Sequence, residues 1–399
     1  VRLQPSNYPN NKASSFLPFN SDALSSECVV NVSRMSLEDN FAIALGKSLG
    51  EAHGKTAVLA YENKLQGQGV AAILQARQWK YADFMHNCIG QSSQAGTSLF
   101  VNAITLPTSS TLVDVNLAYN KLKDRAIKQL AAALVNCKHL LRLELSHNEI
   151  SDQGAIALGE SLLINRSVEE LGLGWNRVGR QGAAAFAAGL VINEGIVSLD
   201  LNGWPYGSQT THGIAPSIQK APKKKGKAPP GSPAARRRTK TKRPNVETIK
   251  EDLRVSREAP RPGEPVSLRP YKDLVPVDVL AQVFKHNARL THLDLSYCNL
   301  TGERVFNILS DGLKDNHTLL GLHVRGNGLR IDCRGFLQLG PSATPHTLNV
   351  GGLSDSRGMP SELNGDRFRY NYDDSCWICD GWTEQTFYAS KGDRRAAAA

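Results

Sequence analysis

Two cysteines separated by two residues, Cys376 and Cys379, have the spacing that is most suggestive of metal or redox chemistry. Such a pair supplies half of a tetrahedral zinc site. The other half is missing, because Cys333 stands alone and His346 has no partner at the spacing of a zinc finger. The surroundings also lack the strand-to-helix pattern that lowers a thiol pKa in redox enzymes. We therefore expect no cofactor and no metal, with Cys376 and Cys379 as weak candidates for ligands.

Seven aromatic residues surround this cysteine pair between Phe368 and Tyr388. Aromatic side chains bury a large apolar area when they dock on another surface. We expect this segment to dock on or cap a folded part of the protein or of its assembly. Its main contacts are then Trp377, Trp382 and Phe387.

The motifs of common enzyme classes are absent from the sequence. It contains no P-loop, no G-x-S-x-G turn and no H-E-x-x-H motif, and its ten histidines are scattered. An active site would have to be assembled from distant segments. We therefore predict that the chain is not an enzyme and has no small-molecule substrate.

A tract rich in proline, lysine and arginine carries the net charge. Residues 219–243 contain eleven lysines and arginines and no acidic residue, whereas the whole chain has a formal charge of +10, so the rest carries about −1. The candidate polyanion-binding residues are Lys223, Lys224, Lys225, Lys227, Arg236, Arg237, Arg238, Lys240, Lys242 and Arg243. Such a tract cannot bury apolar surface, and its charge attracts acidic protein, nucleic acid or anionic lipid.

The tract lacks interleaved aromatic residues that would stack on bases, which argues against sequence-specific RNA recognition. We therefore favour an acidic protein partner, for which tubulin tails are one example. Nucleic acid, a nuclear-import signal and a solvated linker are the alternatives.

The elements that position these residues follow from a repeat of 28 residues. The template L-x-x-L-x-L-x-x-N-x-L starts at Leu112, Leu140 and Val168, and its asparagines are Asn120, Asn148 and Asn176. Apolar residues ten and six positions before the next start have the spacing of one helix face. Each unit is thus a short strand and a helix, and neighbours must stack to bury both. The sequence predicts an α/β solenoid with a curved parallel sheet inside and helices outside.

One repeat is split by an insertion. A fourth strand begins at Ile196, the pattern stops at residues 203–205, and it resumes at Leu290, so that one 28-residue period is lengthened by 66 residues. We expect the missing helix at about residues 277–287 and a basic insertion of disordered type before it. Upstream, Val58 and Asn63 keep the template, and the unit near Phe84 is degenerate.

These patterns divide the chain into six parts. They are an N-terminal extension (1–34), degenerate repeats with capping helices (35–111), repeats (112–204), the basic insertion (205–272), further repeats (273–332) and a C-terminal aromatic extension (333–399). The odd number of cysteines, seven, favours a reducing compartment. No run of 18 apolar residues occurs, and the polar N-terminus does not look like a secretory signal, so we expect no membrane span.

The unit from Leu143 to Leu158 resembles the ribonuclease-inhibitor type of leucine-rich repeat, and this resemblance covers about residues 112–203 and 277–330. That class includes ribonuclease inhibitors, activators of the GTPase Ran, NOD-like receptors and many cytoskeletal and ciliary assembly proteins. The chain departs from the first by its few cysteines and from the second by lacking a long acidic tail. The string from Cys376 to Trp382 is also similar to one in leucine-rich-repeat proteins of ciliated and flagellated cells. The resemblance thus implies a cytoskeletal location, with the cilium or flagellum axoneme as the best guess.

An aromatic residue precedes the template asparagine in successive units, and the strand positions that flank the core leucines are mainly acidic. We expect the aromatics Tyr119, His147, Trp175 and Tyr297, with Trp204 near the equivalent place, to form an exposed ladder. The acidic candidates on the concave face are Glu144, Glu170, Asp200 and Asp294. Because aromatics anchor protein interfaces, we predict a scaffold that holds a protein here and is anchored by the insertion. The alternatives are packing for stability alone, a ribonucleoprotein component and a regulator of a small GTPase.

Overall fold

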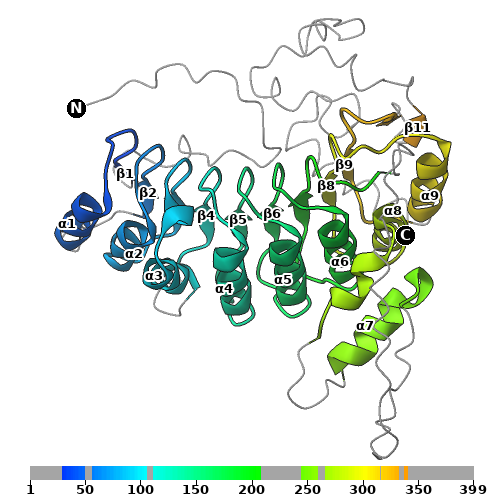
Figure 1. Ribbon diagram of the computed structural model, residues 1–399, viewed down its shortest axis with the longest axis horizontal. Coiled ribbons are helices and arrows are strands. Elements are labelled where there is room, and N and C mark those ends of the chain that lie inside the picture. Colours follow the sequence, from blue (N-terminus) through cyan, green and yellow to red (C-terminus); the bar gives the residue numbers. More distant parts are fainter. Residues whose placement is uncertain are drawn as a thin grey trace, which may run out of the picture.

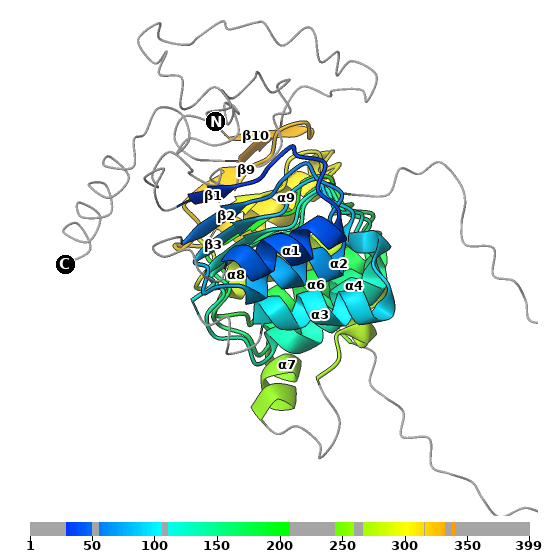
Figure 2. The same ribbon diagram turned by 90° about the vertical axis from the view of Figure 1, so that its left-hand side faces the viewer.

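A computed structural model describes residues 29–49, 56–105, 111–207, 244–258, 266–314, 316–331 and 337–339 of the chain. Within these residues, strands and helices alternate along one elongated array (Figure 1). The strands form one layer and most of the helices form the other, as the view along the array shows (Figure 2). The predicted α/β solenoid is therefore confirmed.

Nine short parallel strands form the sheet in the order of the chain, so every unit contacts only its neighbours. They are β1 (Val29–Asn31), β2 (Ala57–Leu59), β3 (Tyr81–Asp83), β4 (Asp114–Asn116), β5 (Arg142–Glu144), β6 (Glu170–Gly172), β7 (Ser198–Asp200), β8 (His292–Asp294) and β9 (Gly321–His323). A separate antiparallel pair, β10 (Leu329–Ile331) and β11 (Leu337–Leu339), follows the sheet.

The helices lie behind the sheet, roughly one per unit. They are α1 (Asp39–Leu49), α2 (Gly67–Gln75), α3 (Gln94–Thr105), α4 (Asp124–Leu134), α5 (Asp152–Leu162), α6 (Arg180–Leu190), α8 (Pro276–His286) and α9 (Glu303–Leu313). The insertion adds α7 (Ile249–Glu258), preceded by the 3-10 turn η5 (Val246–Thr248) and followed by η6 (Arg269–Asp273). A further 3-10 turn, η3 (Ile89–Gln91), precedes α3.

The core lies between the two layers. The middle residues of five successive strands, which are Val115, Leu143, Leu171, Leu199 and Leu293, are at most 1% exposed. Each template asparagine satisfies backbone carbonyls at the end of its strand, as buried polar backbone requires. The side-chain amides of Asn120, Asn148 and Asn176 each donate to a carbonyl of the preceding unit at 2.9 to 3.0 Å. These asparagines are structural, as the template predicts.

The split repeat is closed as the spacing predicts. Strand β7 pairs in parallel with β8, Ser198 opposite His292, although the insertion separates them in the chain. Helix α8 then packs beside α6 and supplies the helix that the split unit lacked.

Two boundaries differ from the prediction. Strand β1 begins at Val29, inside the segment expected to be an N-terminal extension. The end of the insertion is also not of disordered type, because Ile249, Leu253 and Leu268 are at most 1% exposed against the solenoid. These apolar residues are widely spaced among charged ones, which hid their helical pattern in the sequence.

Candidate binding surface

A left-handed backbone turn recurs at the end of the strands. The residue before the template asparagine position has a positive φ of 53° to 60° at Arg34, Glu62, His86, Tyr119, His147, Trp175 and Tyr297, and of 76° and 69° at Gly203 and Gly326. This conformation is unfavourable for a residue with a Cβ by roughly 1 to 2 kcal/mol. The two glycines show that a residue without a side chain meets the same backbone requirement.

Five of these residues carry rings that lie against one another along the edge of the array, stacked in three of the four pairs and tilted between Trp175 and Tyr297. The ring centroids of His86 and Tyr119 are 4.1 Å apart, and those of Tyr119 and His147 are 4.0 Å apart. The separations are 6.0 Å between His147 and Trp175 and 5.4 Å between Trp175 and Tyr297. We call these five residues the aromatic row, and two of its rings are exposed to solvent, Trp175 at 41% and Tyr297 at 39%.

The surroundings of the two glycines show in which direction the rings of the row point. A Cβ placed on Gly203 would lie 3.3 Å from the ring of Trp175, and one on Gly326 would lie 2.3 Å from the ring of Tyr297. Each ring therefore covers the glycine of the next unit. Because Gly203 has no side chain, Trp175 and Tyr297 meet across it and the row continues past the insertion.

Trp204 does not belong to the aromatic row, which corrects the expectation of an exposed side chain there. It is 0% exposed and takes the place of the template asparagine, with its indole Nε1 donating to the carbonyl of Leu173 at 3.0 Å. Its ring packs against Phe186 and Tyr206. The residue equivalent to Trp175 in this unit is Gly203, one position earlier.

The sequence reasoning missed His86 as a member of the row. The signal was available, because Asn87 follows it and donates to the carbonyl of Ala60 at 2.9 Å, as a template asparagine does. Before His86, the same edge carries an ion pair between Arg34 and Glu62, at 2.9 Å. At the start of the array, this edge therefore carries charged side chains in place of rings.

The acidic strand positions lie beside the aromatic row but are largely covered. Glu144, Asp200 and Asp294 are 8%, 1% and 5% exposed. Glu170 is half-buried and forms an ion pair with Arg142 at 2.6 Å, and Arg142 also contacts Asp114 at 2.9 Å. Of the predicted acidic candidates, Glu170 is therefore the one with a substantial exposed surface.

Glu144 and Asp200 converge from both sides on strand β6 and the residues after it. A Cβ on Gly172 would lie 2.1 Å from Glu144 Oε2, and a Cβ on Gly174 would lie 2.8 Å from Asp200 Oδ2. These two oxygens are buried and have no hydrogen-bond partner in the described part of the chain. Burial raises the pKa of Glu144 to about 7 and also raises the pKa of Asp200, to which the charges of Asp294 and Glu144 contribute.

Asp83 and His147 extend this pattern. Burial, with the charge of Asp114, raises the pKa of Asp83 to about 7. Burial and the neighbouring His86 lower the pKa of His147 to about 4. Both the carboxyl groups and the rings are therefore held in environments that favour their neutral forms. The surface can offer apolar and hydrogen-bonding contacts more readily than charge.

Comparison with known families identifies the repeat. The family model described as "Leucine Rich repeat" matches residues 136–159, 165–187 and 286–303. The chain is a leucine-rich-repeat protein of the ribonuclease-inhibitor type. Solenoids of repeats form extended surfaces that bind other proteins. A search of curated protein sequences gives no match.

Three solved structures have a similar arrangement of elements over part of the chain. The leucine-rich repeat-containing protein LegL7 from Legionella pneumophila is 13% identical, with a TM-score of 0.37, covering 79% of this chain and 94% of that one. The tropomodulin C-terminal domain from Caenorhabditis elegans is 13% identical, with a TM-score of 0.32, covering 56% and 94%. Leiomodin-1 actin-binding site 2 is 18% identical, with a TM-score of 0.29, covering 33% and 76%. At these scores the similarity supports no inference about a partner.

The remaining site predictions lie outside the described residues of this leucine-rich-repeat protein. They are the basic tract from Lys223 to Arg243, the docking residues Trp377, Trp382 and Phe387, and the cysteines Cys376 and Cys379. Within the described residues, no group of three or more histidine, cysteine or acidic side chains is arranged to hold a metal ion. No helix there has the length and apolar composition that crossing a membrane requires.

Proposed function

We propose that this leucine-rich-repeat protein is a non-catalytic scaffold that binds a protein partner along the aromatic row. The observation that carries the proposal is the use of bulky rings at backbone positions that favour glycine. Tyr119, His147 and Trp175 occupy the left-handed turn in three successive units, whereas Gly203 and Gly326 meet the same requirement without strain.

Stacking within the row offsets part of this strain, since an aromatic pair contributes about 0.5 to 1.5 kcal/mol. Stacking leaves the outer edges of Trp175 and Tyr297 in solvent, although the buried core around Trp204 shows that this chain can bury an indole completely. Large aromatic residues that stay exposed are typical anchors of protein interfaces. The row therefore has the composition and the continuity of an interface.

The proposal is tested by replacing Tyr119, Trp175 and Tyr297 with alanine and capturing partners from the source cells under native conditions. We expect partner recovery to fall at least tenfold, as for loss of interface anchors. Phe41→Ala is the matched control, because Phe41 is 68% exposed on α1, away from the row. Capture of the same partners with unchanged affinity by the triple variant would remove the row as an interface.

The partner and the assembly are proposed on less direct grounds. The basic tract at residues 219–243 supports anchoring to an acidic protein, for which tubulin is one candidate, and the string at residues 376–382 supports an axonemal location. A ribonucleoprotein component and a small-GTPase regulator are the alternatives. Running the capture with and without nuclease separates the first two, because only partners held through nucleic acid are lost. Fluorescence microscopy of the tagged protein tests the location.

A further inference from the structure

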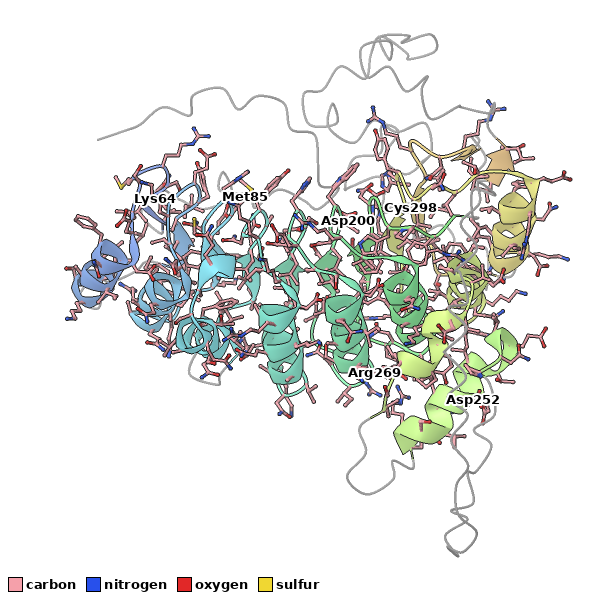
Figure 3. The ribbon with its side chains drawn as sticks, viewed as in Figure 1. Lys64, Met85, Asp200, Asp252, Arg269 and Cys298 are labelled. Atoms are coloured by element: carbon pink, nitrogen blue, oxygen red, sulfur yellow. The ribbon has the colours of Figure 1, made fainter. Side chains whose placement is uncertain are left out.

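A basic pocket lies at the side of the array where the helices are. It is a hollow of about 370 Å³ bordered by the turn after α6, by α7 and by the turn after α8. Figure 3 shows Asp252 on α7 and Arg269 on η6 at the opposite side of the array from Lys64 and from Met85, the residue that precedes His86 of the aromatic row. The pocket is therefore separate from the proposed protein interface.

The sequence of α7 explains why its cations face the hollow. Ile249 and Leu253 are buried and attach the helix to the solenoid. Lys250, Arg254 and Arg257 follow at the spacing of an adjacent helix stripe, and all three line the pocket. Attachment through the apolar pair thus fixes the three cations in place.

The lining has a large excess of positive charge. Lys250, Arg254, Arg257 and Arg289 line it with one carboxylate, that of Glu194, which gives a net charge of +3. Glu194 is already shared between Arg257 at 3.2 Å and Arg166 at 2.7 Å. No acidic side chain among the described residues forms an ion pair with Lys250. Arg254 forms an exposed ion pair with Glu258 at 3.7 Å, of the kind that contributes little. Positive charge from α7 and from the turn after α8 therefore converges on one hollow, which is lined by four cations and one carboxylate.

His286 adds a ring to the lining. Burial and the positive charges of Lys250 and Lys285 lower its pKa, so it is neutral at pH 7. It can then donate or accept a hydrogen bond without adding repulsion between cations. Arg289 follows α8 and belongs to the repeat array. It forms an exposed ion pair with Glu169 at 3.3 Å, of the kind that contributes little to stability.

We propose that this pocket binds a compact ligand that carries two or more phosphate groups. Guanidinium forks match phosphate oxygens in pairs, and the lysine adds a point charge. A hollow of this volume is in the range of small-ligand sites. An extended acidic peptide would need a groove, whereas these cations face one hollow from two sides, α7 and the turn after α8.

The test is calorimetric titration of the full chain with inositol hexakisphosphate at about 150 mM salt, a concentration that screens diffuse charge. We expect one ligand per chain. The double variant Lys250→Gln, Arg254→Gln should weaken binding at least tenfold, and Arg289→Gln alone should weaken it severalfold. Lys223→Gln, Lys224→Gln is the matched control, since it removes two positive charges from the basic tract, and it should change the affinity less than twofold.

Loss of binding in the control equal to that in the pocket variant would overturn the proposal, because the basic tract would then be the binder. Unchanged affinity in both pocket variants would overturn it as well. Circular dichroism of each variant checks that the fold is kept. A second arm uses vesicles with about 5% phosphatidylinositol bisphosphate. Recruitment that inositol hexakisphosphate displaces identifies a lipid headgroup as a ligand, and binding of the soluble probe alone identifies a free phosphate compound.

Discussion

The carboxyl groups of Glu144 and Asp83 are buried on a sheet that has few cations to pair with them. The one basic side chain on β5, Arg142, is engaged by Asp114 and Glu170. Burial therefore raises the pKa of Glu144 to about 7 from 4.5 and that of Asp83 to about 7 from 3.8. Each group binds its proton more tightly in the folded state than in the unfolded state, so folding weakens as the proton is lost.

Glu144→Gln should therefore change the pH dependence of stability. The penalty from Glu144 is absent below its unfolded pKa and complete above its folded pKa, so the free energy of unfolding of the wild type should fall between about pH 4.5 and pH 7. A shift of this size corresponds to about 3 kcal/mol. Urea unfolding at intervals across this range should show the advantage of the variant growing with pH. Asp83→Asn should behave alike, and parallel curves for wild type and both variants would contradict the assignment.

Truncation of Trp204 should destabilise the protein much more than truncation of Trp175. Trp204→Ala opens a cavity in the core and removes a hydrogen bond, so we expect it to lower the free energy of unfolding by about 3 to 5 kcal/mol. Trp175→Ala removes an exposed ring and should lower it by about 1 kcal/mol or less. Trp175→Gly should recover part of that loss by relieving the left-handed strain. Denaturant titration measures all three, and an equal loss at both tryptophans would mean that the aromatic row is part of the core.

At the scale of elements, the 28-residue template allowed β4, β5, β6 and their helices to be predicted, because leucines at fixed spacing can be buried in only one way. Strand β3 was harder, since the small residue Ala82 replaces leucine there. Helix α7 was missed, because two buried residues, Ile249 and Leu253, give too little pattern within a charged segment. Burial can be predicted from the sequence for leucines that recur at a fixed spacing, but not for an isolated apolar residue.

The candidate site was predicted in part for a related reason. A recurrent aromatic position indicated the row. The stacking, however, depends on the left-handed backbone that turns each ring toward the next unit. A tryptophan such as Trp175 does not indicate that backbone conformation in the sequence. Trp204 was placed one position out of register because an indole can replace the template asparagine as a donor. The burial of Glu144 and Asp200 depends on Gly172 in the neighbouring strand β6 and on Gly174 just after it, which is a contact between units.

At the scale of the whole molecule, the array separates a mainly apolar surface from a basic one. Acidic groups and the aromatic row lie on the side of the sheet, and the basic pocket lies beside α7 and the helices. Because the two surfaces are formed by different layers, occupation of one leaves the other open. A scaffold of this kind can hold a protein at the sheet edge while the pocket holds a different, anionic ligand.

The same linear construction determines how the molecule should respond to damage at one unit. Leu143 is fully buried in β5, and Leu143→Ala should lower local stability by about 2 to 5 kcal/mol. Since each strand pairs only with its neighbours, the effect should be largest in the units of β4, β5 and β6 and should decline toward β1 and β9. Hydrogen exchange followed by mass spectrometry resolves this gradient. The matched variant Leu293→Ala in β8 should move the region of lost protection toward β7 and β9, because the sheet is continuous across the insertion. Equal loss of protection along the entire array in both variants would instead show that the solenoid unfolds as one cooperative unit.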